Sequence, residues 1–273
     1  MPRPTERPAA IVEDGAVRTF VFSLIGLVLV AVLADYGTAA YAEYRVSKEI
    51  RNELSLNTDP DVRITGFPFL TQAANGDFSQ VNVRAVGVPM PERGKVTLES
   101  TLRHARVPAS EALGGDLNNI VVGELDSSIR IDDTQLGQLI GISDLKVSAP
   151  VADPALGTSG GGAYQKPKSG IVLTGTVQLG GVLKQQVSVN ADLALQGKQV
   201  RIIATGFALG GQSNKSITLA APLAEIAMQK FSLTLDSDDL PFGIAPTTVH
   251  AEGADIVVEG KGTNVLVSRS ARR

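Results

Sequence analysis

The stretch ITGFPFLTQ, residues 64–72, carries two of the eight phenylalanines of this 273-residue chain, which has no tryptophan. Pro68 fixes its own φ and pushes Phe67 toward an extended backbone. Gly66, just before them, can adopt conformations that are closed to other residues. The stretch therefore predicts a stiff, kinked segment with two large apolar side chains, which serve either as a core anchor or as an apolar contact surface.

The composition of the chain indicates a β-rich protein and excludes several kinds of chemistry. Glycine is frequent, with 28 residues, and only 4 % of residues are aromatic; with abundant valine and threonine, this balance is typical of strands joined by turns. No cysteine is present, which excludes disulfides, Cys-ligated zinc and thiol catalysis together. The formal net charge of −3 gives no basic field for nucleic acid.

The N-terminal region contains an apolar segment. Residues 20–34, FVFSLIGLVLVAVLA, are apolar apart from one serine and one glycine. They are short for a membrane span, which needs about 20 residues, but continuation through Asp35 into residues 36–42, YGTAAYA, reaches that length. Two interpretations stay open: an uncleaved signal anchor, or a signal peptide cut at Ala40-Tyr41-Ala42.

The predicted organisation has three parts. Residues 1–18 form a cytoplasmic tail and residues 19–38 the signal anchor or signal peptide. Residues 39–273 form an extracytoplasmic domain with a flexible loop at 150–170, where proline, glycine, serine and alanine dominate. We therefore expect a single-pass protein of the cell membrane with its domain on the periplasmic side, or a protein exported after cleavage.

Apolar spacing predicts one longer helix and many strands in this domain. Apolar residues recur at three- and four-residue intervals over residues 39–56, which is typical of an amphipathic helix. Most of the remainder alternates apolar and polar residues, as in 171–179 and 187–195, and such strands form antiparallel sheets wetted on one face. Short helices are predicted at Pro108–Leu113, Thr134–Ile140 and Pro222–Lys230.

No catalytic, metal-binding or cofactor-binding pattern stands out. Gly157-Thr158-Ser159-Gly160-Gly161 spells a nucleophile elbow, but it lies in a Gly/Ser-rich loop that no helix follows. The acidic run at residues 236–239 fails as a calcium loop, because Pro241 and Thr247 stand where glycine and glutamate are needed. We predict no catalytic residue, no metal site and no cofactor.

Apolar surface is what remains to be explained. The strands are apolar on one face, and phenylalanines flank prolines at Phe67-Pro68-Phe69 and Leu240-Pro241-Phe242. An ordinary β-core is one explanation. The other is a sheet that curls around an apolar groove holding acyl chains, which requires an apolar lining and no catalytic residue.

Three features in order resemble the LmeA family. The segment Ala39-Ala40-Tyr41-Ala42-Glu43 resembles the start of its members. The strand Asp61-Val62-Arg63-Ile64, followed by residues 66–72 and then Gly76, resembles their most specific motif. Leu240-Pro241-Phe242-Gly243, followed by a strand over 256–260, resembles their end. The resemblance covers nearly the whole exported chain.

Members of that family are actinobacterial cell-envelope proteins that bind phospholipid and influence mannan chain length. The resemblance implies an α+β, β-rich fold in which a curved antiparallel sheet wraps around a long helix as a tube with lipid tails in its lumen. It also implies a non-enzymatic role in lipid binding or transfer, with phospholipid, the cell membrane and envelope glycosyltransferase machinery as partners. For the lipid contacts we single out Phe67, Phe69, Leu70 and Phe242 at the mouth of the tube.

Two other functions stay open. A structural envelope scaffold with a packed β-core would dock a partner enzyme, and a structure with a continuous apolar tunnel would argue against it. An envelope hydrolase would need carboxylates or a Ser/His pair in one cleft, for example Asp132, Asp133 or His104.

Overall fold

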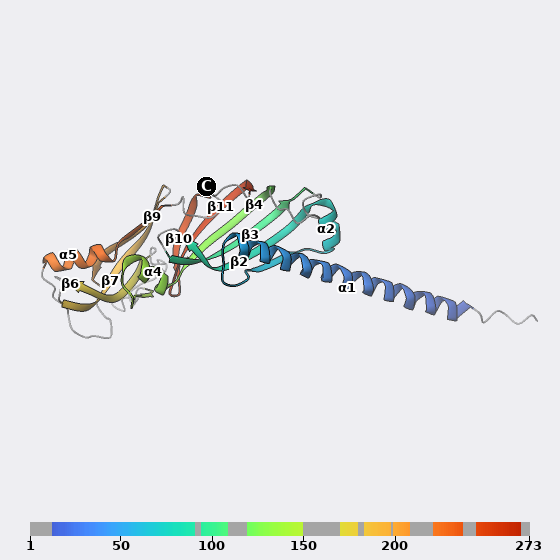
Figure 1. Ribbon diagram of the computed structural model, residues 1–273, viewed down its shortest axis with the longest axis horizontal. Coiled ribbons are helices and arrows are strands. Elements are labelled where there is room, and N and C mark those ends of the chain that lie inside the picture. The colour runs from blue at the N-terminus through green and yellow to red at the C-terminus, as the bar shows by residue number, and fades with distance from the viewer. Residues whose placement is uncertain are drawn as a thin grey trace, which may run out of the picture.

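The computed structural model describes residues 13–90, 94–108, 119–149, 170–179, 183–197, 199–207, 221–236 and 244–268. Its helices are α1 (Glu13–Glu53), α2 (Phe69–Asn75), α4 (Asp133–Ile140) and α5 (Ala221–Lys230). A rod formed by α1 projects far beyond two β-sheets, which follow one another along the length of the molecule (Figure 1). The predicted α+β class with curved antiparallel sheets is confirmed.

The first sheet has six antiparallel strands in the order β1-β2-β3-β4-β11-β10. Their bounds are β1 Asp61–Thr65, β2 Asp77–Met90, β3 Gly94–Arg106, β4 Asn119–Ile131, β10 Pro246–Glu252 and β11 Asp255–Ser268. The second sheet has the order β5-β6-β7-β8-β9. Its strands are β5 Lys146–Ser148, β6 Gly170–Leu179, β7 Leu183–Gln196, β8 Gln199–Phe207 and β9 Leu233–Asp236.

Alternation along β3 shows why these segments form a sheet with one apolar face. Val96, Leu98 and Leu102 are buried, whereas Thr97 and Glu99 between them are half-buried on the other face. Because successive side chains of a strand point to opposite faces, this sequence fixes which face meets the core.

Two apolar clusters divide the core. The first joins both sheets and includes Leu98, Ile129, Leu173 and Phe231. The second lies at the α2 end of the first sheet and contains Leu102, Ala105, Val122, Leu125 and Ile244, with Phe78 packed against it. Between these clusters the buried hydroxyls of Ser100 and Ser127 face each other across β3 and β4 with an Oγ–Oγ distance of 2.9 Å.

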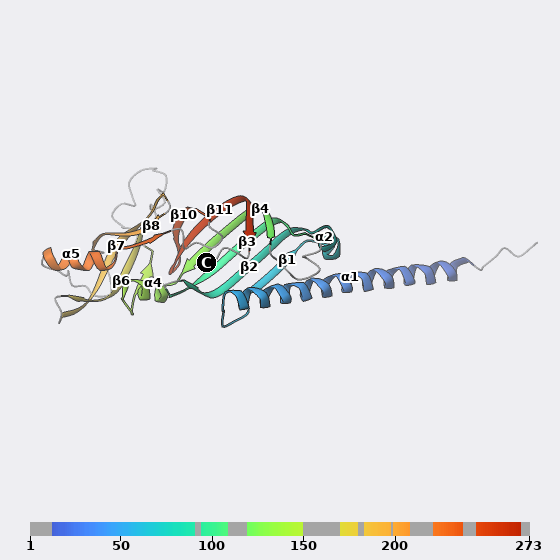
Figure 2. The same cartoon turned by 45° about the horizontal axis from the view of Figure 1, so that its top comes forward.

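The helix predicted over residues 39–56 is the C-terminal part of α1, which runs unbroken for 41 residues. This part packs against the edge strand β1, Asp35 just before it contacts α2, and the N-terminal part projects freely (Figure 2). In the part of the chain that the structure describes, this is the one helix long and apolar enough to cross a membrane, and its apolar window is not buried against the domain.

Two of the short helices agree with the structure. Asp132 begins α4 with a capping box, accepting the Gln135 N–H while the Gln135 side chain accepts the Asp132 N–H, as expected for an acidic cap. The helix predicted at Pro222–Lys230 is α5. The helix predicted at Pro108–Leu113, the loop at 150–170 and the Leu240-Pro241-Phe242 segment lie wholly or almost wholly outside the described residues.

Candidate functional site

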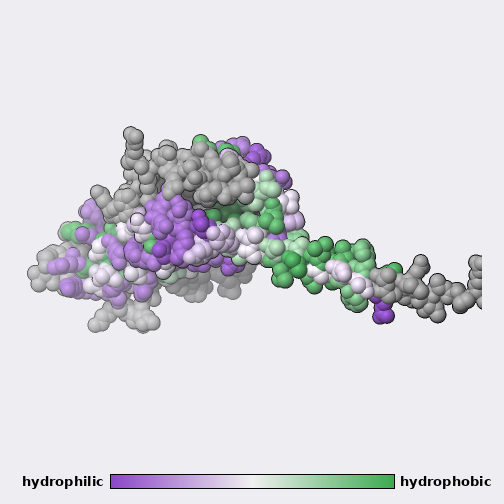
Figure 3. Space-filling view, turned by 45° about the vertical axis from the view of Figure 1, so that its right-hand side comes forward, coloured by the Kyte–Doolittle hydropathy of each residue, from purple (hydrophilic) through white to green (hydrophobic). Residues whose placement is uncertain are grey.

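The projecting part of α1 displays apolar side chains on all sides. Phe20, Leu27 and Leu33 are each more than half exposed, and hydrophobic colour covers this part of the helix up to its junction with the domain (Figure 3). A helix that is apolar all round needs an apolar environment. The site of interest therefore begins where this rod meets the domain.

A short helix, α2, lies at that junction. Pro68, with φ −76° and ψ 139°, precedes its first residue, and Gly76, with φ 64°, ends it by donating its N–H to carbonyls of the last turn. Proline beside a helix start and a left-handed glycine after its end are the usual boundary residues. The Phe67–Pro68 peptide bond is cis. The 66–72 stretch is thus a kink followed by a helix, and the helix was not predicted.

Gly66 and Gln72 close this segment on itself. Gly66 has φ +117°, and a Cβ there would lie 2.6 Å from Gln72 Nε2. The Gln72 Oε1 atom accepts the Ser79 N–H at 2.9 Å, whereas its Nε2 atom is buried without a hydrogen-bond partner. Glycine is needed at position 66 for its backbone conformation, and a side chain there would also have to displace the end of the Gln72 side chain.

Asp35 of α1 caps α2 from outside. No side chain of the α2 segment caps its own N-terminus. Instead the Asp35 carboxylate, only 5 % exposed, accepts the Phe69 N–H at 2.9 Å and the Leu70 N–H at 2.8 Å. The first N–H groups of a helix lack partners within it and carry a partial positive charge, so a carboxylate satisfies both requirements. The one acidic residue next to the apolar segment therefore joins α1 to α2.

The predicted contact residues take two different positions. The Phe67 side chain is 61 % exposed, and its ring stacks on that of Tyr36 of α1 with centroids 6.2 Å apart. Leu70 is also exposed. Phe69, by contrast, is buried, and its ring lies 6.1 Å from that of Phe78. We call the exposed set of Leu33, Tyr36, Phe67 and Leu70 the junction patch. Phe242 lies outside the described residues.

Further contacts fasten α1 along β1. The Glu43 carboxylate accepts the Ile64 N–H at 2.7 Å, and Ser47 Oγ donates to the Pro60 carbonyl at 2.6 Å. Lys48 lies 2.9 Å from Asp59, and their hydrogen bond lowers the pKa of this carboxyl. The domain is consequently attached to the helix over several turns.

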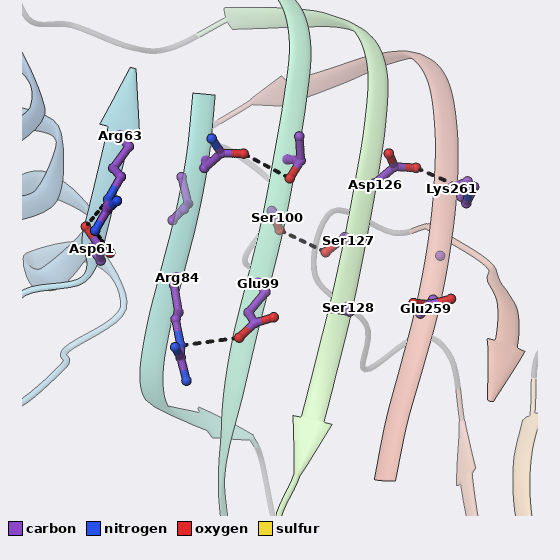
Figure 4. Close-up of a pocket in the computed structure, with 14 residues that line it drawn as sticks. Asp61, Arg63, Arg84, Glu99, Ser100, Asp126, Ser127, Ser128, Glu259 and Lys261 are labelled. Carbon is purple, nitrogen blue, oxygen red and sulfur yellow. Dashed lines mark hydrogen bonds and ion pairs between the residues drawn. The ribbon is translucent and has the colours of Figure 1, made fainter. Parts of the chain in front are cut away.

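The polar face of the first sheet forms a trough of about 460 Å³. Figure 4 shows its charged side chains on adjacent strands: Arg84 lies 3.2 Å from Glu99, and Lys261 lies 3.8 Å from Asp126. Because these cations face carboxylates, the trough offers hydrogen-bonding groups rather than a strong field of one sign. Within the described ranges no cluster of His, Asp or Glu could hold a metal ion.

The residues considered for hydrolysis do not converge. Asp132 caps α4, and Asp133 pairs with Lys146 at 2.9 Å, which lowers the pKa of Asp133. His104 lies at the α2 end of β3, where its neighbour Arg103 pairs with Glu124 of β4. Asp132 follows Glu124 by eight residues, or about 27 Å along an extended strand. These side chains therefore occupy opposite ends of the sheet.

A β-rich domain with an apolar helix fastened to its edge fits the class of membrane-associated lipid-binding proteins. The sequence model of the family described as LmeA-like phospholipid-binding matches residues 33–261. The chain therefore belongs to this family, as its motifs indicated. Comparisons with curated proteins and with solved structures gave no match.

Proposed function

We propose that this chain is a non-enzymatic phospholipid-binding or lipid-transfer protein held at the cell membrane by α1. The observation that carries the proposal is the family match over residues 33–261. It begins in the apolar part of α1 and runs through both sheets, so membrane-proximal helix and β-domain belong to one unit. The apolar faces of the two sheets supply the environment that acyl chains require.

The contacts of α1 support a retained anchor rather than a cleaved signal peptide. Cleavage after Ala40-Tyr41-Ala42 would remove Asp35 and Tyr36, and with them the cap of α2 and the stacking partner of Phe67. It would leave two helix N–H groups without their acceptor, which is unfavourable. The domain then stays on the outer side of the membrane as part of a single-pass protein.

Phe67 and Leu70 are the residues we assign to lipid contact, because both are exposed beside the apolar rod. Phe69 supports them from beneath through Phe78. Phe242 keeps the same assignment on its sequence motif alone. A role in mannan chain elongation, with envelope glycosyltransferases as partners, rests on the family resemblance.

Native mass spectrometry of the full chain in detergent tests the proposal. We expect phospholipid bound at a fixed stoichiometry and taken up again from liposomes after delipidation. The matched control is a peptide of residues 1–56, which carries the anchor without the sheets and reports lipid held by the rod alone. Equal lipid retention by peptide and full chain would refute binding by the β-domain.

A structural scaffold is the second candidate. Two observations favour it: the apolar side chains of the sheets pack into two buried clusters, and the 460 Å³ trough is polar. The same experiment separates the two functions, because a scaffold retains no more lipid than the anchor peptide does.

A further inference from the structure

The α2 segment has the features of a movable cover. Residues 66–76 connect the edge strand β1 to β2, and glycines with positive φ stand at both ends, Gly66 at +117° and Gly76 at +64°. The one buried residue of α2 is Phe69, whose ring faces Phe78. Phe78 in turn packs on the second apolar cluster. Lifting α2 would therefore expose the end of that cluster.

The position of α2 along α1 places it at the membrane surface. Its cap, Asp35, directly follows the apolar residues 20–34. The 15 apolar residues 20–34 rise about 22 Å, which crosses most of the roughly 30 Å hydrocarbon core of a bilayer. Tyr36 then lies at the interface, where tyrosine rings are enriched. Phe67 stacks on this ring, so the junction patch is continuous with the membrane-spanning surface.

Besides the burial of Phe69 against Phe78, three kinds of contact keep α2 closed. They are the two hydrogen bonds to Asp35, the stacking of Phe67 on Tyr36, and the bond from the Ser79 N–H to Gln72. The buried Gln72 Nε2 atom has no hydrogen-bond partner when the segment is closed. Since water would satisfy this donor in an open segment, the closed state is less strongly favoured than its packing alone suggests.

We infer that α2 covers a portal through which an acyl chain passes from the bilayer to the second apolar cluster, and that the junction patch docks this portal on the same bilayer. Insertion of Phe67 and Leu70 into the interface offsets the loss of their contacts with α1. Phe69 then leaves Phe78 and makes room for the chain. This inference rests on the proposed function and specifies the route by which lipid reaches the β-domain.

A reversible cross-link tests the inference cleanly, because the chain has no cysteine of its own. The variant Tyr36→Cys/Phe67→Cys places two thiols at positions whose rings are 6.2 Å apart. A short bifunctional thiosulfonate then holds the segment to α1, and a reductant releases it. The matched control, Glu43→Cys/Ile64→Cys, links α1 to β1 without touching α2.

The full chain is reconstituted in vesicles that contain a phospholipid with a diazirine in its acyl chain. After illumination, labelling is measured in the tryptic peptide 96–103, where fragmentation separates Leu102 of the second cluster from Leu98 of the first, and in peptide 19–45 of the rod as an internal standard. We expect the cross-link to lower labelling of peptide 96–103 by about tenfold or more, because it removes the open population. Reductant restores the labelling to the level of the same variant before cross-linking, and cross-linking the control pair leaves its labelling unchanged.

Equal labelling of peptide 96–103 with and without the cross-link overturns the portal and leaves lipid binding standing. Absence of label from this peptide in every state, while the rod is labelled, overturns the proposed function as well. In the uncross-linked chain, Asp35→Ala should raise the initial labelling rate, and an unchanged rate in a variant with native circular dichroism also counts against the portal.

Discussion

Asp35 of α1 accepts a hydrogen bond from the Leu70 backbone N–H, with the carboxylate oxygen 2.8 Å from the Leu70 nitrogen. The second oxygen accepts the Phe69 N–H. One carboxylate thus joins the apolar rod to the segment 66–72, and this relationship leads to the first prediction.

Asp35→Ala should accelerate hydrogen exchange at the amides of Phe69 and Leu70. Each hydrogen bond to a charged group contributes ~1.5–3 kcal/mol, so exchange should rise between about tenfold and a hundredfold. The measurement is exchange of the detergent-solubilised chain followed by mass spectrometry with fragmentation. Glu43→Ala is the control, because it should release the Ile64 amide instead. Uniform acceleration across both sheets would mean that Asp35 supports the whole fold.

The junction patch makes a prediction about depth in the bilayer. Because the chain has no tryptophan, Phe67→Trp introduces a single fluorophore into the patch. Lipids with brominated acyl chains should quench it strongly. Val86→Trp, at an exposed position toward the other end of β2, is the matched reporter and should stay unquenched. Similar quenching at the two positions would contradict the placement of the patch.

Alanine substitutions of Phe67 and Phe69 should lower the free energy of unfolding by different amounts, although only Pro68 separates the two residues. Phe69→Ala removes a buried ring and should lower the free energy of unfolding by ~3–5 kcal/mol, whereas an exposed stacked ring contributes ~0.5–1.5 kcal/mol. Denaturant unfolding followed by circular dichroism measures both. A comparable loss for Phe67→Ala would show that its contact with Tyr36 belongs to the core.

Substitutions of the buried pair Ser100 and Ser127 should have non-additive effects on the free energy of unfolding. Ser100→Ala or Ser127→Ala alone leaves a buried hydroxyl without its partner and should cost ~1–3 kcal/mol. The double variant removes both hydroxyls and should cost less than the sum of the single effects. A double-mutant cycle by denaturant unfolding measures the coupling. Strict additivity would mean that the hydrogen bond of 2.9 Å contributes nothing.

The hydrogen bonds of the Asp144 carboxylate predict a loss of stability in acid. Its carboxylate accepts the Thr176 hydroxyl at 2.7 Å and the Thr176 N–H at 2.8 Å, which lowers its pKa below 3.8. Because the pKa of Asp144 is lower in the folded chain than in the unfolded chain, the unfolded chain binds this proton more tightly. The stabilisation by ionised Asp144 is therefore fully present above the unfolded pKa and is lost as the pH falls through the folded pKa. Thermal melts of wild type and Asp144→Asn should converge below pH 3.8. A constant difference between the melts would exclude this linkage.

Much of the sheet could be predicted from the sequence, because period-two alternation in segments such as 187–195 reports directly on the buried face. The candidate functional site was harder to predict from the sequence. Asp35 looks like an interruption of an apolar segment, and only the tertiary contact with Phe69 and Leu70 reveals it as a cap. Pro68 and Gly76 were available as boundary signals for α2, but seven residues between them give too little periodicity to predict a helix.

The contrast between Phe67 and Phe69 shows the same limit. Both are phenylalanines beside Pro68, so the sequence alone assigns the same role to both of them. The turn from kink to helix sends one ring toward Tyr36 and the other toward Phe78. Which face each ring takes depends on α2, so a sequence interpretation without that helix cannot separate them.

The unbroken course of α1 has a consequence for orientation. The 18 residues from Tyr36 to Glu53 rise about 27 Å without a joint, and β1 is bonded to them along the way. In the proposed anchored arrangement, the far sheet consequently keeps a set height above the membrane and a set direction around the helix axis. Insertion of a single residue between Leu33 and Asp35 would turn that direction by about 100°. As the proposed anchor, α1 would therefore determine the direction in which the domain faces as well as where it is held.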